Sequence, residues 1–282
     1  MKPILALLLF SSPLGGLMAQ TASAPAASAP PTIVLKNGLS QPAVQIERQD
    51  DRVMVTVTTP SGGKGQVAYN VSDISELKMP PPPELATAAA LIANGHAREA
   101  LELLQPILAF EQSLRDIPGN YWDKTALTQS YALANVNQTA ESESLLKDII
   151  KSSSNPEMQL AAKLQLSLES PPKDAGEALT DYDTIISKSS DAATLTRAWM
   201  AEGDIHFSQH EFADAVLNYL SVVVFYPDQN PVLPKALWGA ALSYGKLKDT
   251  VDQEKTWHEL MTNYPDSPEA TLAKTESIKK EK

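Results

Sequence analysis

The chain has 282 residues, a formal net charge of −11 and no cysteine. Its acidity argues against a nucleic-acid partner, because phosphate backbones bind to basic surfaces. The absence of cysteine excludes disulfide bonds, a thiol nucleophile and a lipid attached through a cysteine. The acidity either keeps the protein soluble or attracts a basic face of a partner, and the sequence leaves both open.

Residues 1–19 have the pattern of a secretory signal peptide. Lys2 precedes a short apolar run, and small residues follow up to Ala19, which we expect to be the last residue before cleavage. The apolar run is too short and too interrupted for a membrane span, so an uncleaved anchor is the less favoured alternative. Residues 20–32 are rich in Ala, Ser and Pro and predict a linker.

Residues 33–78 alternate apolar and polar side chains, as half-buried strands do. Ile33 and Leu35 begin this pattern, and Val53, Val55 and Val57 continue it between turns rich in Gly, Asn and Asp. Four or five short strands and a final helical turn resemble a small SH3-like barrel. The alternative is a small antiparallel sheet that packs on the helices.

Residues 79–84 include four consecutive prolines, which favour a stiff extended segment and predict a spacer at a domain boundary. A proline run can also be a ligand for aromatic grooves.

Residues 85–275 have the three-and-four spacing of apolar residues that is typical of helices. A recurring marker, a small residue after a turn, predicts five helical hairpins at Ala100, Ser142, Ala178, Ala215 and Gln253. Insertions at residues 111–120 and 231–235 explain why the repeats are long. Residues 276–282 predict a polar tail.

The last two hairpins share one packing pattern, in which large and small residues alternate at fixed offsets. The first copy is Trp199, Gly203, Ala215, Tyr219 and Pro227, and the second, 38 residues later, includes Leu237, Ala241, Trp257 and Pro265. This pattern resembles the tetratricopeptide repeat (TPR). The resemblance implies a mostly α protein, a TPR-like α-solenoid of about five hairpins, here preceded by a small antiparallel β barrel or sheet.

In this family the first helix of each hairpin lines a concave surface that holds a protein or peptide. His206 and Tyr244 occupy matching positions on two such helices. With Asn218 and Lys248, they are the candidate ligand contacts.

The evidence for catalytic or metal chemistry is weak. Glu202, His206 and His210 have helical spacing that could in principle present three metal ligands. The order of a metalloprotease motif is absent, and so are a nucleophile elbow and a phosphate-binding loop. We therefore expect no metal, no cofactor and no enzymatic activity.

Residues 197–275 are similar to the repeats of periplasmic proteins that coordinate envelope assembly, namely the barrel-assembly lipoprotein and the Tol-Pal-associated coordinator of division. The chain lacks the lipid-bearing cysteine of the first and the coiled coil of the second. The resemblance favours a secreted, periplasmic adaptor with a protein or peptide in its groove. The alternative is an envelope glycan-binding protein, in which the β module binds and the repeats act as a spacer.

Overall fold

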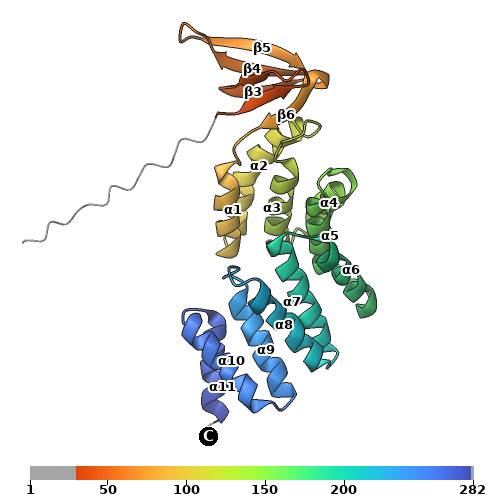
Figure 1. Ribbon diagram of the computed structural model, residues 1–282, viewed down its shortest axis with the longest axis vertical. Helices are drawn as coiled ribbons and strands as arrows, with labels where there is room; N and C mark the ends of the chain where they lie inside the picture. The colour runs from red at the N-terminus through yellow and green to blue at the C-terminus, as the bar shows by residue number, and fades with distance from the viewer. Residues whose placement is uncertain (1–29, 281–282) are drawn as a thin grey trace, which may run out of the picture.

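The computed structural model describes residues 30–280, in which six strands precede eleven helices (Figure 1). The predicted fold class is confirmed. The predicted signal peptide and most of the predicted linker lie outside the described residues. The strands are β1 Thr32–Leu35, β2 Ser40–Pro42, β3 Gln45–Gln49, β4 Arg52–Thr58, β5 Lys64–Asn70 and β6 Ile74–Lys78.

The strands form two three-stranded antiparallel sheets, ordered β2-β1-β6 and β3-β4-β5, which we call the β module. Val53 and Val55 of β4 are fully buried, while their neighbours along the strand are more exposed, as the alternating pattern predicts.

The last strand differs from the prediction, which placed a helical turn at the end of the module. A 3-10 turn, Val71–Asp73, is followed by β6. In β6, Ile74 and Leu77 are three residues apart and yet both are buried, because the register against β1 shifts by one residue between Val34 and Leu35. Such a bulge breaks the period of two by which strands are recognised in a sequence.

The helices form five consecutive hairpins and one final helix. They are α1 Pro83–Ala93 with α2 Ala97–Ser113, α3 Trp122–Asn135 with α4 Thr139–Ser152, α5 Pro156–Glu169 with α6 Ala175–Lys188, α7 Ala192–Ser208 with α8 Phe212–Phe225, α9 Leu233–Lys246 with α10 Thr250–Asn263, and α11 Pro268–Lys280.

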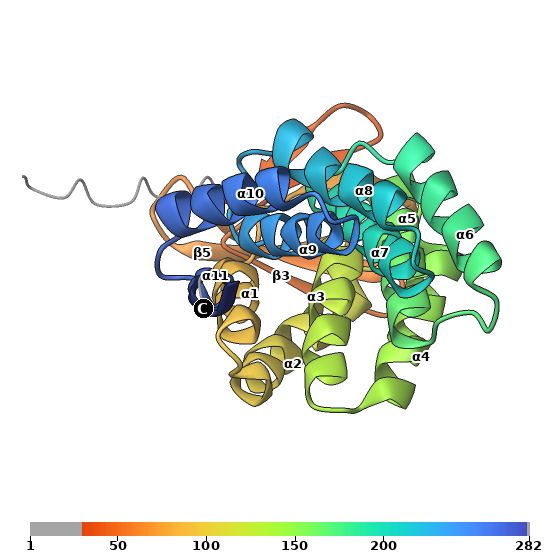
Figure 2. The ribbon, with the colours of Figure 1, turned by 90° about the horizontal axis from the view of Figure 1, so that it is seen from below.

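The first helices of the hairpins form the inner side of the stack. They contact one another in series from α1 through α3, α5, α7 and α9 to α11, whereas the main contacts of the second helices are with first helices. Figure 2 shows α2, α4, α6, α8 and α10 on the outside. The inner, concave side is therefore made of first helices. No helix within residues 30–280 has both the length and the apolar character needed to cross a membrane.

The two helices of each hairpin pack together through a buried residue that recurs at the same position of the second helix. The five marker residues all stand at the fourth position of their helix, and all are nearly or fully buried. Small side chains such as Ala100 and Ala215, each fully buried, let the two helices approach closely.

Four of the five hairpins turn in the same way. Each connection has three residues, and the middle one has a positive φ: Gly95 (82°), Asn137 (62°), His210 (67°) and Lys248 (64°). The backbone bonds are those of the Schellman motif, for example Asp249 N–H to Tyr244 O at 3.0 Å and Lys248 N–H to Gly245 O at 3.2 Å. The third hairpin, α5 with α6, has a longer connection of residues 170–174.

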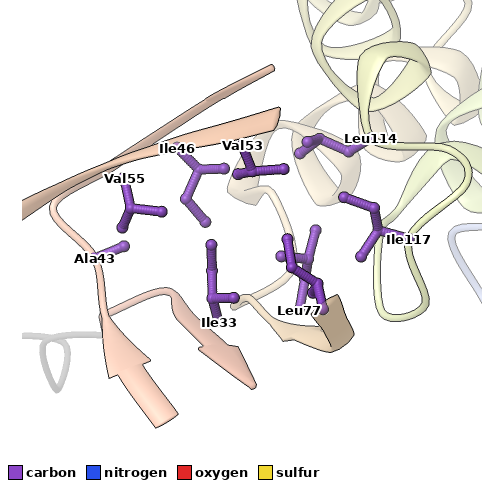
Figure 3. Close-up of a cluster of buried hydrophobic side chains, with 9 residues drawn as sticks. Ile33, Ala43, Ile46, Val53, Val55, Leu77, Leu114 and Ile117 are labelled. Atoms are coloured by element: carbon purple, nitrogen blue, oxygen red, sulfur yellow. The ribbon is translucent and has the colours of Figure 1, made fainter. Parts of the chain in front are cut away.

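The β module packs on the loop between α2 and α3, which we call the docking loop (residues 114–121). Leu114 and Ile117 of this loop are buried in the same cluster as Ile33, Val53 and Leu77 of the strands (Figure 3). Full burial of each aliphatic side chain contributes about 1.5–3 kcal/mol. The loop thus completes the hydrophobic core of the β module.

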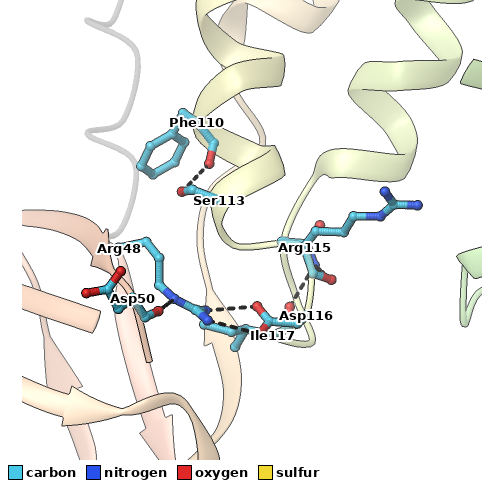
Figure 4. Close-up of polar contacts among 8 residues, drawn as sticks. Arg48, Asp50, Phe110, Ser113, Arg115, Asp116 and Ile117 are labelled. Carbon is cyan, nitrogen blue, oxygen red and sulfur yellow. Dashed lines mark hydrogen bonds and ion pairs between the residues drawn. The ribbon is translucent and has the colours of Figure 1, made fainter. Parts of the chain in front are cut away.

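Polar contacts fix the orientation of this joint. Leu77 N–H donates to Pro118 O at 2.7 Å, and the Arg48 guanidinium donates to both Asp116 oxygens at 2.9 and 3.2 Å (Figure 4). Gly119 has a φ of +87°, and a Cβ there would lie 2.0 Å from Leu77 O. Only glycine therefore fits between the docking loop and β6.

The same loop is fixed on its other side to the solenoid. Arg115 donates to both carboxylate oxygens of Asp148 on α4 at 2.7 Å, and its guanidinium lies 3.6 Å from the centre of the Trp122 ring. The buried Glu111 accepts from Tyr121 N–H at 2.7 Å. The prolines at residues 80–82 therefore connect two parts of the chain that also touch through the docking loop.

The positive φ at the middle of these three-residue turns predicts that a glycine substitution there stabilises the protein. Lys248 has a left-handed backbone that costs a non-glycine residue about 1–2 kcal/mol. After allowance for the greater freedom of glycine in the unfolded chain, Lys248→Gly should raise the free energy of unfolding by roughly 0.5–1 kcal/mol, measured by urea denaturation.

Lys255→Gly, within helix α10, is the matched control and should lower stability by about 1 kcal/mol. Equal losses in the two variants would show that the turn at Lys248 is not strained.

Candidate functional site

The four candidate ligand contacts are distributed over α7 to α10. His206 lies in the last turn of α7, Asn218 on α8, Tyr244 on α9, and Lys248 in the turn after α9. None of the four lines the cavities described below.

Asn218 lies between helices rather than on an open surface. It is only 7 % exposed, and its Nδ2 donates to Oε2 of the nearly buried Glu202 at 2.8 Å. Burial raises the pKa of Glu202 to about 7, and the nearby carboxylate of Asp183 on α6 adds to this effect. Around neutral pH this buried carboxyl is therefore partly protonated.

His206 and His210 point to different surroundings. His206 Nδ1 lies 2.7 Å from Glu211 Oε2, whereas the His210 ring, in the exposed turn, packs 5.7 Å from the ring of Phe212. The potential metal ligands that the described residues bring together here are His206, Glu211 and Asp214, with donor atoms within 4.8 Å of one another. This set differs from Glu202, His206 and His210, which the helical spacing suggested.

Tyr244 and Lys248 are near the turn of the last hairpin. Tyr244 is half-buried, and burial raises the pKa of its hydroxyl, an effect to which the carboxylates of Asp252 and Asp249 add. Lys248 is exposed. Its backbone conformation shapes the turn, as described above.

Gly203 and Ala215 of the repeat-packing residues lie next to one aromatic ring, that of Tyr219. Any Cβ at Gly203 or at Gly239 would lie 2.7 Å from this ring, so two helices, α7 and α9, contact it through glycines. Its hydroxyl donates to Asp204 at 2.7 Å. Of the other residues in the pattern, Ala215, Leu237, Ala241 and Trp257 are buried, Trp199 is half-buried, and Pro227 and Pro265 are exposed after the second helices.

A polar ladder that sequence reasoning missed crosses three first helices. Arg197 on α7 donates to Gln165 Oε1 on α5 and, at 2.8 Å, to the hydroxyl of Tyr131 on α3, and its guanidinium lies 4.7 Å from the Tyr131 ring centre. Tyr131 and Arg197 are partly exposed. The one feature of the sequence that could have predicted this ladder is spacing, because the three side chains recur about one repeat apart on first helices.

The largest cavities lie elsewhere. A groove of about 750 Å³ runs between β3 and α2 and is lined mainly by apolar residues such as Ile46, Met79 and Phe110. A more polar cleft of about 830 Å³ lies along the docking loop and the connection between α4 and α5. A smaller cleft, of about 430 Å³, opens between α5 and α6.

Comparison with known proteins gives only distant structural similarity. No family model and no curated protein matches the sequence. Two crystal structures of nearly identical TPR-like repeats from a Podosopora anserina putative kinesin light chain, one of them a point variant, have TM-scores of 0.43 and 0.42. Each is 14 % identical in sequence and covers 64 % of this chain and 92 % of its own. The contacts between successive helices of the chain itself define its repeat architecture.

The buried carboxyl of Glu202 predicts a pH dependence of stability. Because its pKa rises from 4.5 when unfolded to about 7 when folded, the folded state binds more protons between these values, and stability falls as pH rises through this window. Glu202→Gln keeps an acceptor for Asn218 and removes the titration.

We expect Glu202→Gln to be more stable than wild type at pH 8 and to show a smaller loss between pH 5 and pH 8 in thermal melts. The exposed Glu254→Gln is the control and should follow wild type. Parallel pH profiles for wild type and Glu202→Gln would contradict the assignment.

Proposed function

We propose that the protein is a non-enzymatic adaptor that binds a protein or peptide on the concave surface of its helical solenoid. The observation that carries this proposal is the series of contacts among first helices, which makes a continuous inner surface from α1 to α11. Stacked hairpins characteristically use such surfaces for protein partners.

The polar ladder gives this surface a defined binding chemistry. Arg197 is held by Gln165 and Tyr131, so its guanidinium is positioned before a partner arrives. A guanidinium presents several donors in one plane and suits a carboxylate of a peptide. Because the surface is formed in advance, little ordering cost opposes binding. His206 and Tyr244 remain candidate contacts further along the solenoid.

The β module would make a second contact. Its six strands in two sheets around one core, with a 3-10 turn before the last strand, support the SH3-like interpretation. Its fixed orientation on the solenoid would present both surfaces to one partner or to two partners at a constant angle.

The cell envelope is the proposed location. The pattern of residues 1–19 supports secretion, and the similarity of residues 197–275 to periplasmic repeat proteins supports the periplasm and a role in envelope assembly.

The glycan-binding alternative receives less support. Protein surfaces that bind sugars commonly present exposed aromatic rings, and Tyr69 is the only aromatic residue in the six described strands. Its side chain is only partly exposed and packs against the core of the β module. We therefore favour the adaptor.

The adaptor proposal predicts that partner capture depends on the concave surface. We expect the mature chain to capture its partner from an envelope fraction, with the captured amount measured by mass spectrometry. The Arg197→Glu variant should capture at least tenfold less partner than wild type, because a carboxylate that repels the carboxylate of the peptide replaces the guanidinium. Tyr244→Ala should reduce capture to a smaller extent.

The matched control is Arg52→Glu, which makes the same charge change at an exposed position of the β module. Equal capture by wild type and Arg197→Glu, with loss in Arg52→Glu, would transfer the binding role to the β module.

A further inference from the structure

The third hairpin is built differently from the other four. Its connection, residues 170–174, has five residues instead of three and includes Pro171 and Pro172. Proline has no N–H group, so it cannot donate the bonds that close the other turns. Accordingly, α5 and α6 are the most loosely packed pair among the five hairpins of the described chain.

This opening creates the cleft of about 430 Å³ between the two helices. Its apolar part is made by Leu160, Leu166 and Ile185, which also belong to the cores on either side. Ser167 Oγ donates to the Tyr182 hydroxyl at 3.3 Å and bridges α5 and α6. Leu160 and Leu166 are partly exposed in this cleft, whereas Ile185 is only 3 % exposed and forms its floor.

The charge of the cleft is opposite to that of the molecule. Lys163 and Lys188 line it together with one acidic residue, Asp181, in a chain with a net charge of −11. Both lysines are exposed, and within residues 30–280 neither has an ion pair within 4.0 Å. Two unpaired ammonium groups next to apolar side chains thus form a positive, partly apolar site.

We propose that this cleft is a second peptide-binding site, which takes an acidic segment that carries an aliphatic side chain next to carboxylates. The aliphatic side chain packs on Leu160, Leu166 and Ile185, and the carboxylates pair with Lys163 and Lys188. Convergent polar groups around an apolar cavity are the usual form of a ligand site, and the lysines select acidic over neutral sequences. The site lies within a hairpin and is distinct from the concave surface proposed above.

The test uses a blocked, fluorescein-labelled peptide of alternating Leu and Glu, and its Leu/Gln counterpart, measured by fluorescence anisotropy with the mature chain at low salt. We expect the Leu/Glu peptide to bind at least tenfold more tightly than the Leu/Gln peptide. The double variant Lys163→Gln/Lys188→Gln should lose at least tenfold in affinity for the Leu/Glu peptide and little for the Leu/Gln peptide.

One control changes the net charge by the same amount at another place. Lys151→Gln/Lys255→Gln alters exposed lysines outside the cleft and should bind the Leu/Glu peptide within about twofold of wild type. Arg197→Glu reports any binding of the peptide to the concave surface, and circular dichroism melts confirm that each variant is folded.

Charge reversal gives a second, independent test. Lys163→Glu/Lys188→Glu should prefer a Leu/Lys peptide to the Leu/Glu peptide. No difference between the Leu/Glu and Leu/Gln peptides, or no effect of the cleft variants, would overturn the proposal. A loss confined to Arg197→Glu would overturn it as well, and would place the peptide on the concave surface in agreement with the adaptor function.

Discussion

The insertion of two aliphatic side chains from the docking loop into the core of the β module is the contact on which the arrangement of the molecule depends. Leu114 and Ile117 are almost fully buried among strand residues, although they belong to the loop that connects the first two helical hairpins. Without them a small sheet would have an incomplete core, and small domains have little stability to lose. Gly119 allows the backbone approach that this insertion requires.

This joint has a consequence for binding. Since the loop is held by the β module on one side and by Asp148 and Trp122 on the other, we infer that the β module and the solenoid move as one body although a segment of prolines connects them. The apolar groove between β3 and α2 exists only because of this orientation. A rigid arrangement lowers the entropic cost of engaging two surfaces at once.

The sequence predicted what depends on local periodicity and missed what depends on distant contacts. The sequence predicts five hairpins because small residues such as Ala100 recur after four of the five turns, with Gln253 at the fifth. In the sequence the docking loop has the pattern of an insertion, since nothing local shows that Leu114 enters a core built from residues far earlier. Arg197 is likewise joined to Tyr131 across 66 residues. The prolines at residues 171–172 are a local signal of the loose third hairpin, but the sequence does not show that Lys163 and Lys188 line one cleft.

The most direct test of the account is the distance between the two parts of the molecule in solution. Because the chain has no cysteine, spin labels can be placed at Gln66→Cys on β5 and Glu141→Cys on α4, with Glu141→Cys and Glu254→Cys as a reference pair within the solenoid. We predict that double electron–electron resonance gives one narrow distance distribution for the Gln66→Cys/Glu141→Cys pair, as narrow as that of the reference pair. Gly119→Ala should broaden the distribution of this pair and leave that of the reference pair unchanged. A broad distribution for the unsubstituted joint would show that the β module moves independently and would contradict the account.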